Sequence, residues 1–177
     1  MTLSGSRGGR AARPLNPLTW LLLPALACLL ATWLLAVPLR VAGLRLPEPV
    51  FAVVLAFAWA LVRPSLLAPF ALLLVGMVLD LFWGAAMGFW ALSLLIGYAA
   101  VLVTRPLISG QGYVVTWVWY AGTVLLVLGA AYLFTMMDAR VRPSFWAVAS
   151  QALVTGLLYP VAGRLIDQFE EADVRFR

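Results

Sequence analysis

The sequence predicts an all-α integral membrane protein, built as a compact bundle of about six transmembrane helices with both termini in the cytoplasm. Of its 177 residues, 64% are hydrophobic and only 11% are charged, which is too apolar for a soluble domain. The apolar residues form runs of roughly 20, the length of helix that crosses a bilayer core of about 30 Å. Short breaks that contain Arg or Pro separate these runs.

The N-terminal part consists of an arm and the first helix. Residues 1–16 are rich in Gly, Ser, Ala and Arg and cannot bury enough apolar surface to fold, so we expect a disordered basic cytoplasmic arm. A six-helix transmembrane domain then covers residues 17–163. Its first helix is expected over residues 17–37, with Pro24 as a bend or a late helix start.

The second helix is unusually short. Residues 38–49 include Pro47-Glu48-Pro49, which forbids a continuous helix, and they are expected to form a loop. The next apolar run, 50–62, is only about 20 Å long as a helix, shorter than a bilayer core. We expect either a locally thinned membrane or Arg63 extending to the interface from within the span.

The third and fourth helices are expected to form a hairpin. Pro64 disfavours helix at Arg63, and Ser65 can cap a third helix over residues 66–83. The fourth helix is expected over residues 89–104. Because the connection between them is short and lacks polar residues, the two helices are expected to pack closely and antiparallel.

The last two helices follow Arg105-Pro106, which is expected to end the fourth helix. They are predicted over residues 113–135 and 144–163. Residues 164–177 are expected to form a short amphipathic cytoplasmic tail. Three apolar residues of the tail share one helical face and are candidates for binding a partner: Leu165, Ile166 and Phe169.

The arginines predict the orientation. Cytoplasmic loops of membrane proteins carry an excess of basic residues. With six spans and the N-terminus inside, the arginines inside are Arg7, Arg10, Arg13, Arg63, Arg105, Arg164, Arg175 and Arg177, and those outside are Arg40, Arg45, Arg140 and Arg142. The net charge of +5 therefore indicates membrane topology. It does not indicate nucleic-acid binding, because the arginines form no contiguous patch.

Asp80 is the one acidic residue inside an apolar run, where an ionisable group is costly without a partner. Gly76, Gly84 and Gly88 lie at steps of four residues around it, and small residues at this spacing allow close helix packing. A functional interpretation makes Asp80 a proton or ion site. A structural interpretation, which we favour, makes it a cap for the next helix, whose first residues offer no side-chain acceptor. Arginines on the same predicted side could also neutralise Asp80: Arg40, Arg45, Arg140 and Arg142.

The sequence does not indicate an enzyme. It contains no histidine, and its single cysteine, Cys28, lies inside the first apolar run and is expected to be a small buried hydrophobic residue. No cluster of His, Cys and carboxylates suits a metal, and no serine has a nearby base. We therefore expect no catalytic residue, no metal and no cofactor.

A family resemblance begins at Arg63-Pro64 and continues through Gly76 and Asp80 to Ala91. This stretch resembles the rod-shape-determining MreD family, which typically reads D-x-x-S-G-x-P-x-G-x-H-A. Asp80, Gly84, Gly88 and Ala91 match that pattern. The chain departs from it at three positions, where Trp83, Ala86 and Trp90 stand in place of the usual Ser, Pro and His.

The resemblance implies a non-enzymatic scaffold in the bacterial inner membrane that helps to organise peptidoglycan synthesis and cell shape. Its implied partners are an MreC-type membrane protein, the elongation complex's SEDS glycosyltransferase and class B penicillin-binding protein, and, indirectly, an MreB-type actin-like filament. Two alternatives remain. One is the substrate-binding membrane subunit of an energy-coupling-factor transporter, which needs polar side chains converging on a pocket. The other is a small proton-coupled transporter that uses Asp80.

Overall fold

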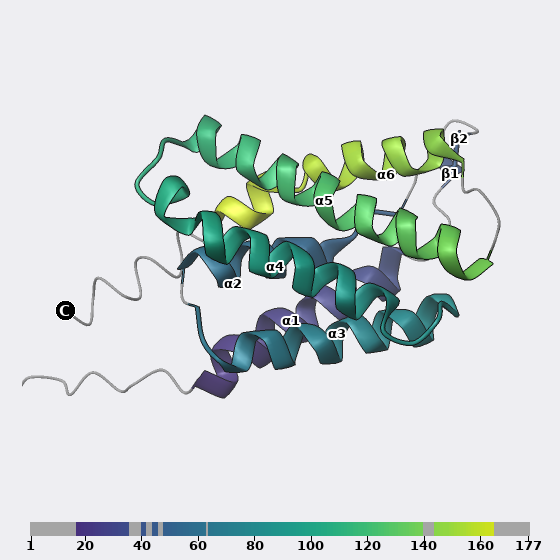
Figure 1. The fold of residues 1–177 in the computed structure, drawn as a ribbon, viewed down its shortest axis with the longest axis horizontal. Coiled ribbons are helices and arrows are strands. Elements are labelled where there is room, and N and C mark those ends of the chain that lie inside the picture. The colour runs from purple at the N-terminus through teal and green to yellow at the C-terminus, as the bar shows by residue number, and fades with distance from the viewer. Residues whose placement is uncertain are drawn as a thin grey trace, which may run out of the picture.

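A computed structural model describes residues 17–35, 40–41, 44–45, 48–62, 64–139 and 144–164 (Figure 1). In these residues the chain forms six helices and one small hairpin: α1 (Pro17–Leu35), β1 (Arg40–Val41), β2 (Leu44–Arg45), α2 (Phe51–Val62), α3 (Leu67–Trp83), α4 (Phe89–Ile108), α5 (Tyr113–Ala139) and α6 (Phe145–Gly156). The predicted basic arm, Arg63 and the tail residues Leu165, Ile166 and Phe169 lie outside the described residues.

The short helix α2 is the centre of the bundle. Every residue from Ala52 to Leu61 is buried, and α2 packs against α1, α3, α4 and α5. The sequence predicts a short transmembrane span here, which needs either a thinned membrane or an Arg63 side chain that extends to the interface. In the structure the other helices cover α2, so its length does not have to match the thickness of a bilayer core. A helix with apolar residues on all sides suits such a position.

The helices α3 and α4 form the predicted antiparallel hairpin, and α4 also packs on α2 and α5. Ser65 has the predicted capping role, since its Oγ accepts a hydrogen bond from the Ala68 N–H at 3.2 Å. The loop predicted over residues 38–49 contains an antiparallel pair of two-residue strands in which Arg40 faces Arg45 across the ladder.

The bundle has two distinct ends. The α3–α4 connection and the β1–β2 hairpin lie at one end, which we call the Asp80 end (right in Figure 1). The start of α1 and the helical turn that reaches Arg164 lie at the other, which we call the Arg105 end (left in Figure 1). The two ends of the described chain are therefore on the same side of the bundle.

Two predicted helix ends were wrong, and one predicted helix contains an unexpected break. The fourth helix does not end at Arg105-Pro106 but runs to Ile108, because a proline in the last turn removes only one helical hydrogen bond. The fifth helix extends beyond its predicted end to Ala139. The sixth ends at Gly156, turns at residues 157–158 and resumes as a helix over residues 159–164.

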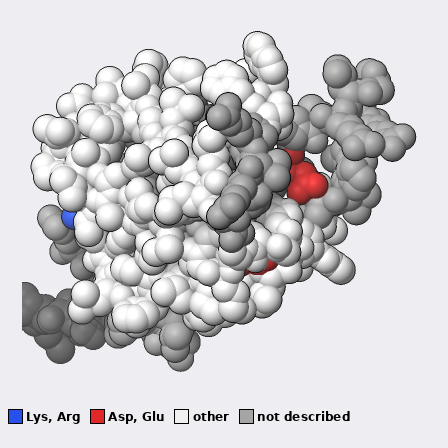
Figure 2. All heavy atoms as spheres, turned by 45° about the vertical axis from the view of Figure 1, so that its right-hand side comes forward, with Lys and Arg blue, Asp and Glu red and all other residues white. Residues whose placement is uncertain are grey.

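Three helical stretches are long and apolar enough to cross a membrane by length and composition: Phe89–Ile108, Tyr113–Met137 and Phe145–Arg164. The remaining apolar helices of the described part, Leu21–Leu35, Phe51–Val62 and Leu67–Trp83, are shorter. The outer surface is apolar as well, and charged atoms occupy little of the face in Figure 2. Both properties are typical of a helical membrane protein.

Candidate functional site

The site is the α3–α4 connection with Asp80 beneath it. Asp80 lies in the last turn of α3 and is completely buried. Its Oδ2 accepts a hydrogen bond from the Gly88 N–H at 2.9 Å, and its Oδ1 accepts one from the Trp90 N–H at 2.8 Å. The predicted contact between this carboxylate and the start of the fourth helix is therefore confirmed. The side chains of the arginines that were considered as counter-charges lie outside the described residues: Arg40, Arg45, Arg140 and Arg142.

These two hydrogen bonds provide the acceptors that the first N–H groups of α4 lack. The first N–H groups of a helix have no partner within the helix, and the residue that begins α4, Gly88, has no side chain to accept them. Gly88 has a φ of 95°, which favours glycine and makes a side chain there, including the capping residues Ser and Thr, strained. A carboxylate from α3 thus caps α4 and faces the positive end of its dipole.

Gly84 ends α3 for a related reason. Its φ of 64° is left-handed, and the N–H of Ala85 donates to the carbonyl of Asp80 at 2.9 Å. This is the Schellman arrangement, in which a glycine satisfies the last free carbonyls of a helix. Asp80 consequently contributes to the caps of both helices. Its backbone carbonyl takes part in the C-cap of α3, and its side-chain carboxylate forms the N-cap of α4.

Gly76 brings the two helices together. A Cβ added to Gly76 would overlap the backbone N and Cα atoms of Ala91 on α4. Small residues at a helix crossing permit this close backbone approach. The four glycine and aspartate positions singled out from the sequence thus all shape one hairpin. Pro64 is exposed in the α2–α3 turn, at the opposite end of the bundle.

Two of the three departures from the family pattern contact each other. The rings of Trp83 and Trp90 pack with centroids 4.9 Å apart at 51°. The indole N–H of Trp83 donates to the carboxylate of Glu48 at 3.3 Å, and this contact ties the segment before α2 to the hairpin. Sequence reasoning missed Glu48, which it treated only as a loop residue between prolines.

A second polar cluster, which was not predicted from the sequence, lies where α6 breaks. Pro160 has no N–H to donate to the carbonyl of Gly156, and the indole N–H of Trp117 donates to that carbonyl at 3.3 Å. The hydroxyl of Tyr120 donates to the neighbouring carbonyl of Thr155 at 3.0 Å. The Trp117 indole thus replaces a missing helical hydrogen bond, whereas Tyr120 adds a second bond to a carbonyl that already accepts the Leu158 N–H at 3.1 Å. The signal available in the sequence was Pro160 inside the sixth apolar run.

Side chains of α6 near the same cluster form hydrogen bonds with the residues that precede α2. Thr155 is completely buried, and its hydroxyl oxygen accepts a hydrogen bond from the Val50 N–H at 3.2 Å. The side-chain amide of Gln151, one turn earlier on α6, donates to the carbonyl of Glu48 at 3.1 Å. At 1.5 Å per residue, Thr155 lies about 15 Å along the helix from Phe145. The N-terminus of α2 is therefore near the middle of the bundle.

Arg105 has a specific role at the opposite end. Its Nε donates to the carbonyl of Leu61 at 2.8 Å, and its Nη2 donates to that of Val62 at 3.3 Å. These are the last carbonyls of α2, where the negative end of the helix dipole favours a cation. Arg105 was expected to mark the end of the fourth helix, but it caps a neighbouring helix.

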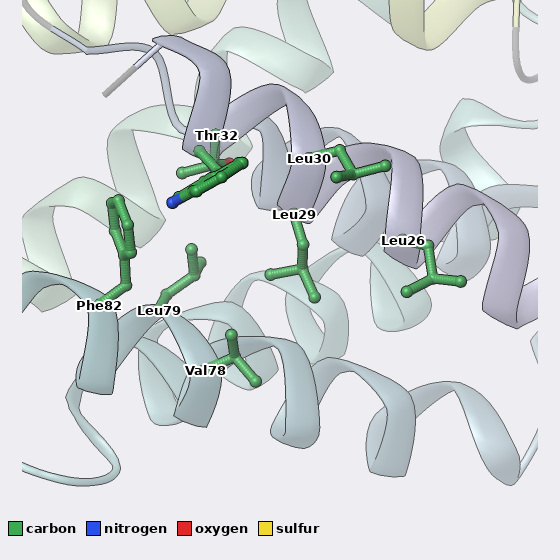
Figure 3. A pocket seen from close by; sticks show the side chains of 8 residues that line it. Leu26, Leu29, Leu30, Thr32, Val78, Leu79 and Phe82 are labelled. Carbon is green, nitrogen blue, oxygen red and sulfur yellow. The ribbon is translucent and has the colours of Figure 1, made fainter. Parts of the chain in front are cut away.

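An open groove of about 250 Å³ lies between α1 and α3 (Figure 3). Its polar side chains are Thr32, whose hydroxyl donates to the carbonyl of Cys28 at 2.9 Å, and Trp33. The other lining residues are aliphatic or aromatic: Leu26, Leu29, Leu30, Val78, Leu79 and Phe82. In the part of the chain that the structure describes, no three His, Cys, Asp or Glu residues cluster as metal ligands.

Comparison of the chain with protein-family models, with curated proteins and with solved structures found no match.

Proposed function

We propose that this protein is a multi-pass scaffold of the bacterial inner membrane that serves cell elongation in the manner of the MreD family. In this proposal all six helices lie in the bilayer, with α2 enclosed by the others. The protein binds an MreC-type membrane protein and, within the same complex, the SEDS glycosyltransferase and the class B penicillin-binding protein. It performs no chemistry of its own.

The hydrogen bonding of Asp80 is the observation that carries the proposal. Both carboxylate oxygens accept backbone N–H groups, and the side chain is completely buried. A proton carrier must exchange its proton with water or with another ionisable group. An Asp80 that caps α4 instead shapes the surface that the hairpin presents. This geometry favours a scaffold over a proton-coupled transporter.

The apolar groove also favours a scaffold, in this case over the substrate-binding subunit of an energy-coupling-factor transporter. A vitamin-binding subunit needs several polar groups that converge on its ligand. The groove between α1 and α3 offers mainly hydrocarbon, and the Thr32 hydroxyl already bonds within its own helix. Such a surface suits a lipid chain or another helix better than a polar substrate.

Co-purification tests the function directly. The full chain, tagged and extracted from membranes in mild detergent, should recover an MreC-type protein and the peptidoglycan-synthesising pair, identified by mass spectrometry. An Asp80→Leu variant, expected to disrupt the hairpin, should lose them. Recovery of a paired transport ATPase instead would overturn the scaffold proposal and favour the energy-coupling-factor alternative.

A further inference from the structure

The groove between α1 and α3 changes in character along its length. Trp33 and Phe82 lie in the last turns of α1 and α3, at the Asp80 end of the bundle. Leu26, seven residues before Trp33, lies about 10 Å further from that end along α1. The side chains between these positions are mainly aliphatic, as Figure 3 shows: Leu29 and Leu30 from α1, and Val78 and Leu79 from α3. The groove therefore runs from an aromatic rim into a hydrocarbon interior.

The indole N–H of Trp33 is an available hydrogen-bond donor at this rim. Trp33 is 64% exposed, and among the residues that the structure describes its N–H donates to no acceptor. The other polar side chain of the groove, Thr32, already donates to the carbonyl of Cys28. A polar group next to hydrocarbon is costly without a partner, and tryptophans at a membrane boundary place their N–H where an acceptor is present. A ligand of the groove should therefore carry an acceptor at the rim.

The size and the chemistry of the groove favour a lipid chain over a partner helix. A helix with its side chains is about 10–12 Å across, so one turn occupies roughly 500 Å³, about twice the 250 Å³ of the groove. The backbone carbonyls of a membrane helix are already paired within that helix, so they are not free to accept the Trp33 N–H. An ester-linked lipid has a narrow apolar chain with a carbonyl where the chain begins. Both features match the groove and its rim.

We propose that this groove binds one acyl chain of an ester-linked phospholipid. The ester carbonyl accepts the Trp33 N–H, and the chain extends past Leu30 toward Leu26. None of the residues that line the groove is charged, so the headgroup lies outside it and binding does not depend on headgroup charge. The inference rests on the membrane location in the proposed function but not on the scaffold role or the partners.

Photo-crosslinking of the unmodified full chain in nanodiscs tests the location of the site. The probe is a phosphatidylcholine with a diazirine on one acyl chain, diluted into ordinary phosphatidylcholine, and the labelled residues are identified by mass spectrometry. Labelling should be several-fold stronger at residues 26–33 and 78–82 than at residues 125–133 of α5, where Leu125 and Leu133 are similarly exposed. Equal labelling of the two regions would show only the lipids that surround any membrane protein, and it would overturn the proposal.

A variant that fills the groove tests its shape. Leu30 is 57% exposed, so Leu30→Trp adds bulk to the groove without disturbing the core, and it should reduce the labelling of residues 78–82 to the level of α5. Leu125→Trp is the matched control, since it adds the same bulk to an exposed leucine outside the groove, and it should leave that labelling unchanged. Unchanged labelling in Leu30→Trp, or an equal loss in Leu125→Trp, would contradict a site in the groove.

The hydrogen bond to the ester is tested by native mass spectrometry of the full chain with ester-linked and ether-linked phosphatidylcholines that have the same chains. One neutral hydrogen bond should favour retention of the ester lipid by roughly two- to tenfold. Trp33→Phe keeps an aromatic ring but removes the donor, and it should abolish this preference. Trp146→Phe is the matched control, because Trp146 is also exposed and lies at the start of α6, at the same end of the bundle. Equal retention of both lipids by the unmodified chain would contradict the ester contact.

Two further outcomes would overturn the proposal. Stronger retention of phosphatidylglycerol than of phosphatidylcholine would indicate a site that recognises the headgroup. Loss of labelling in the groove when the chain is purified as a dimer or with its protein partners would indicate that a helix occupies the groove. Co-purification of the elongation partners is a separate readout, so failure of the lipid site and failure of the proposed function can be distinguished.

Discussion

Gly76 on α3 and Ala91 on α4 are in backbone contact, so close that a Cβ on Gly76 would overlap the N and Cα atoms of Ala91. Asp80 lies one turn further along α3, and its carboxylate reaches the N–H of Trp90, the residue next to Ala91. The close approach of the helices thus brings the carboxylate within reach of the α4 backbone. Gly76 therefore sets the helix separation at which Asp80 can cap α4.

Replacement of Gly76 should separate the two helices. Gly76→Ala gains about 1 kcal/mol of helix propensity, but overpacking against a backbone costs about 1–3 kcal/mol or more. We expect a net loss of stability, measured as a lower melting temperature in detergent. Gly122→Ala is the control, because a Cβ at Gly122 in α5 meets nothing within 4 Å. A Gly76→Ala protein as stable as Gly122→Ala would contradict the close contact.

Substitutions at Asp80 separate its structural role from a proton-carrying role. An asparagine offers one acceptor oxygen for two N–H donors, so Asp80→Asn leaves one of them unpaired at a cost of about 1–3 kcal/mol. Asp80→Leu leaves both unpaired. In a cell-shape complementation assay with membrane abundance measured, Asn should retain most function and Leu should lose both abundance and function. A stable but inactive Asn variant would instead favour a proton or ion site.

The contact between Trp83 and Trp90 suggests that the two departures from the family pattern compensate for each other. Trp83→Ser and Trp90→His, which introduce the usual family residues, should each lower the melting temperature. The double variant should be more stable than the sum predicts, by a coupling energy of about 0.5–1.5 kcal/mol. Strict additivity in this double-mutant cycle would show that the two rings act independently.

The predicted orientation can be checked with a reporter that is active only in the periplasm. Fused after Arg177, it should be silent, whereas fused within residues 140–143, between α5 and α6, it should be active. The placement of Arg105 and Arg164 together at one end of the bundle agrees with this orientation. An active reporter after Arg177 would reverse the assignment of every loop.

The sequence was sufficient to predict the hairpin because its determinants are local. Asp80, Gly84 and Gly88 lie within three turns of each other. Because the first residues of α4 offer no side-chain acceptor for its free N–H groups, an acceptor from a residue nearby in the sequence is expected. The role of α2 was harder to predict, because hydropathy does not distinguish a helix surrounded by lipid from one surrounded by protein. The bonds of Tyr120 and Gln151 link residues far apart in the sequence, and no local pattern indicates them.

Thr155 provides a test of how α2 is held inside the bundle. Its hydroxyl accepts the Val50 N–H, and neither group is near water, because Thr155 is completely buried and Val50 is 1% exposed. Thr155→Val keeps the volume but leaves that N–H unpaired, at a cost of about 1–3 kcal/mol. We expect a lower melting temperature and faster amide exchange at residues 50–53, with little change at residues 84–91, whose hydrogen bonds come from Asp80. Thr155→Ser is the matched control, since it keeps the acceptor and loses one methyl group, and it should lower stability less than Val. If Ser lowered stability more than Val, packing of the methyl group would be the main contribution of Thr155, and the hydrogen bond would not be what holds α2 in position.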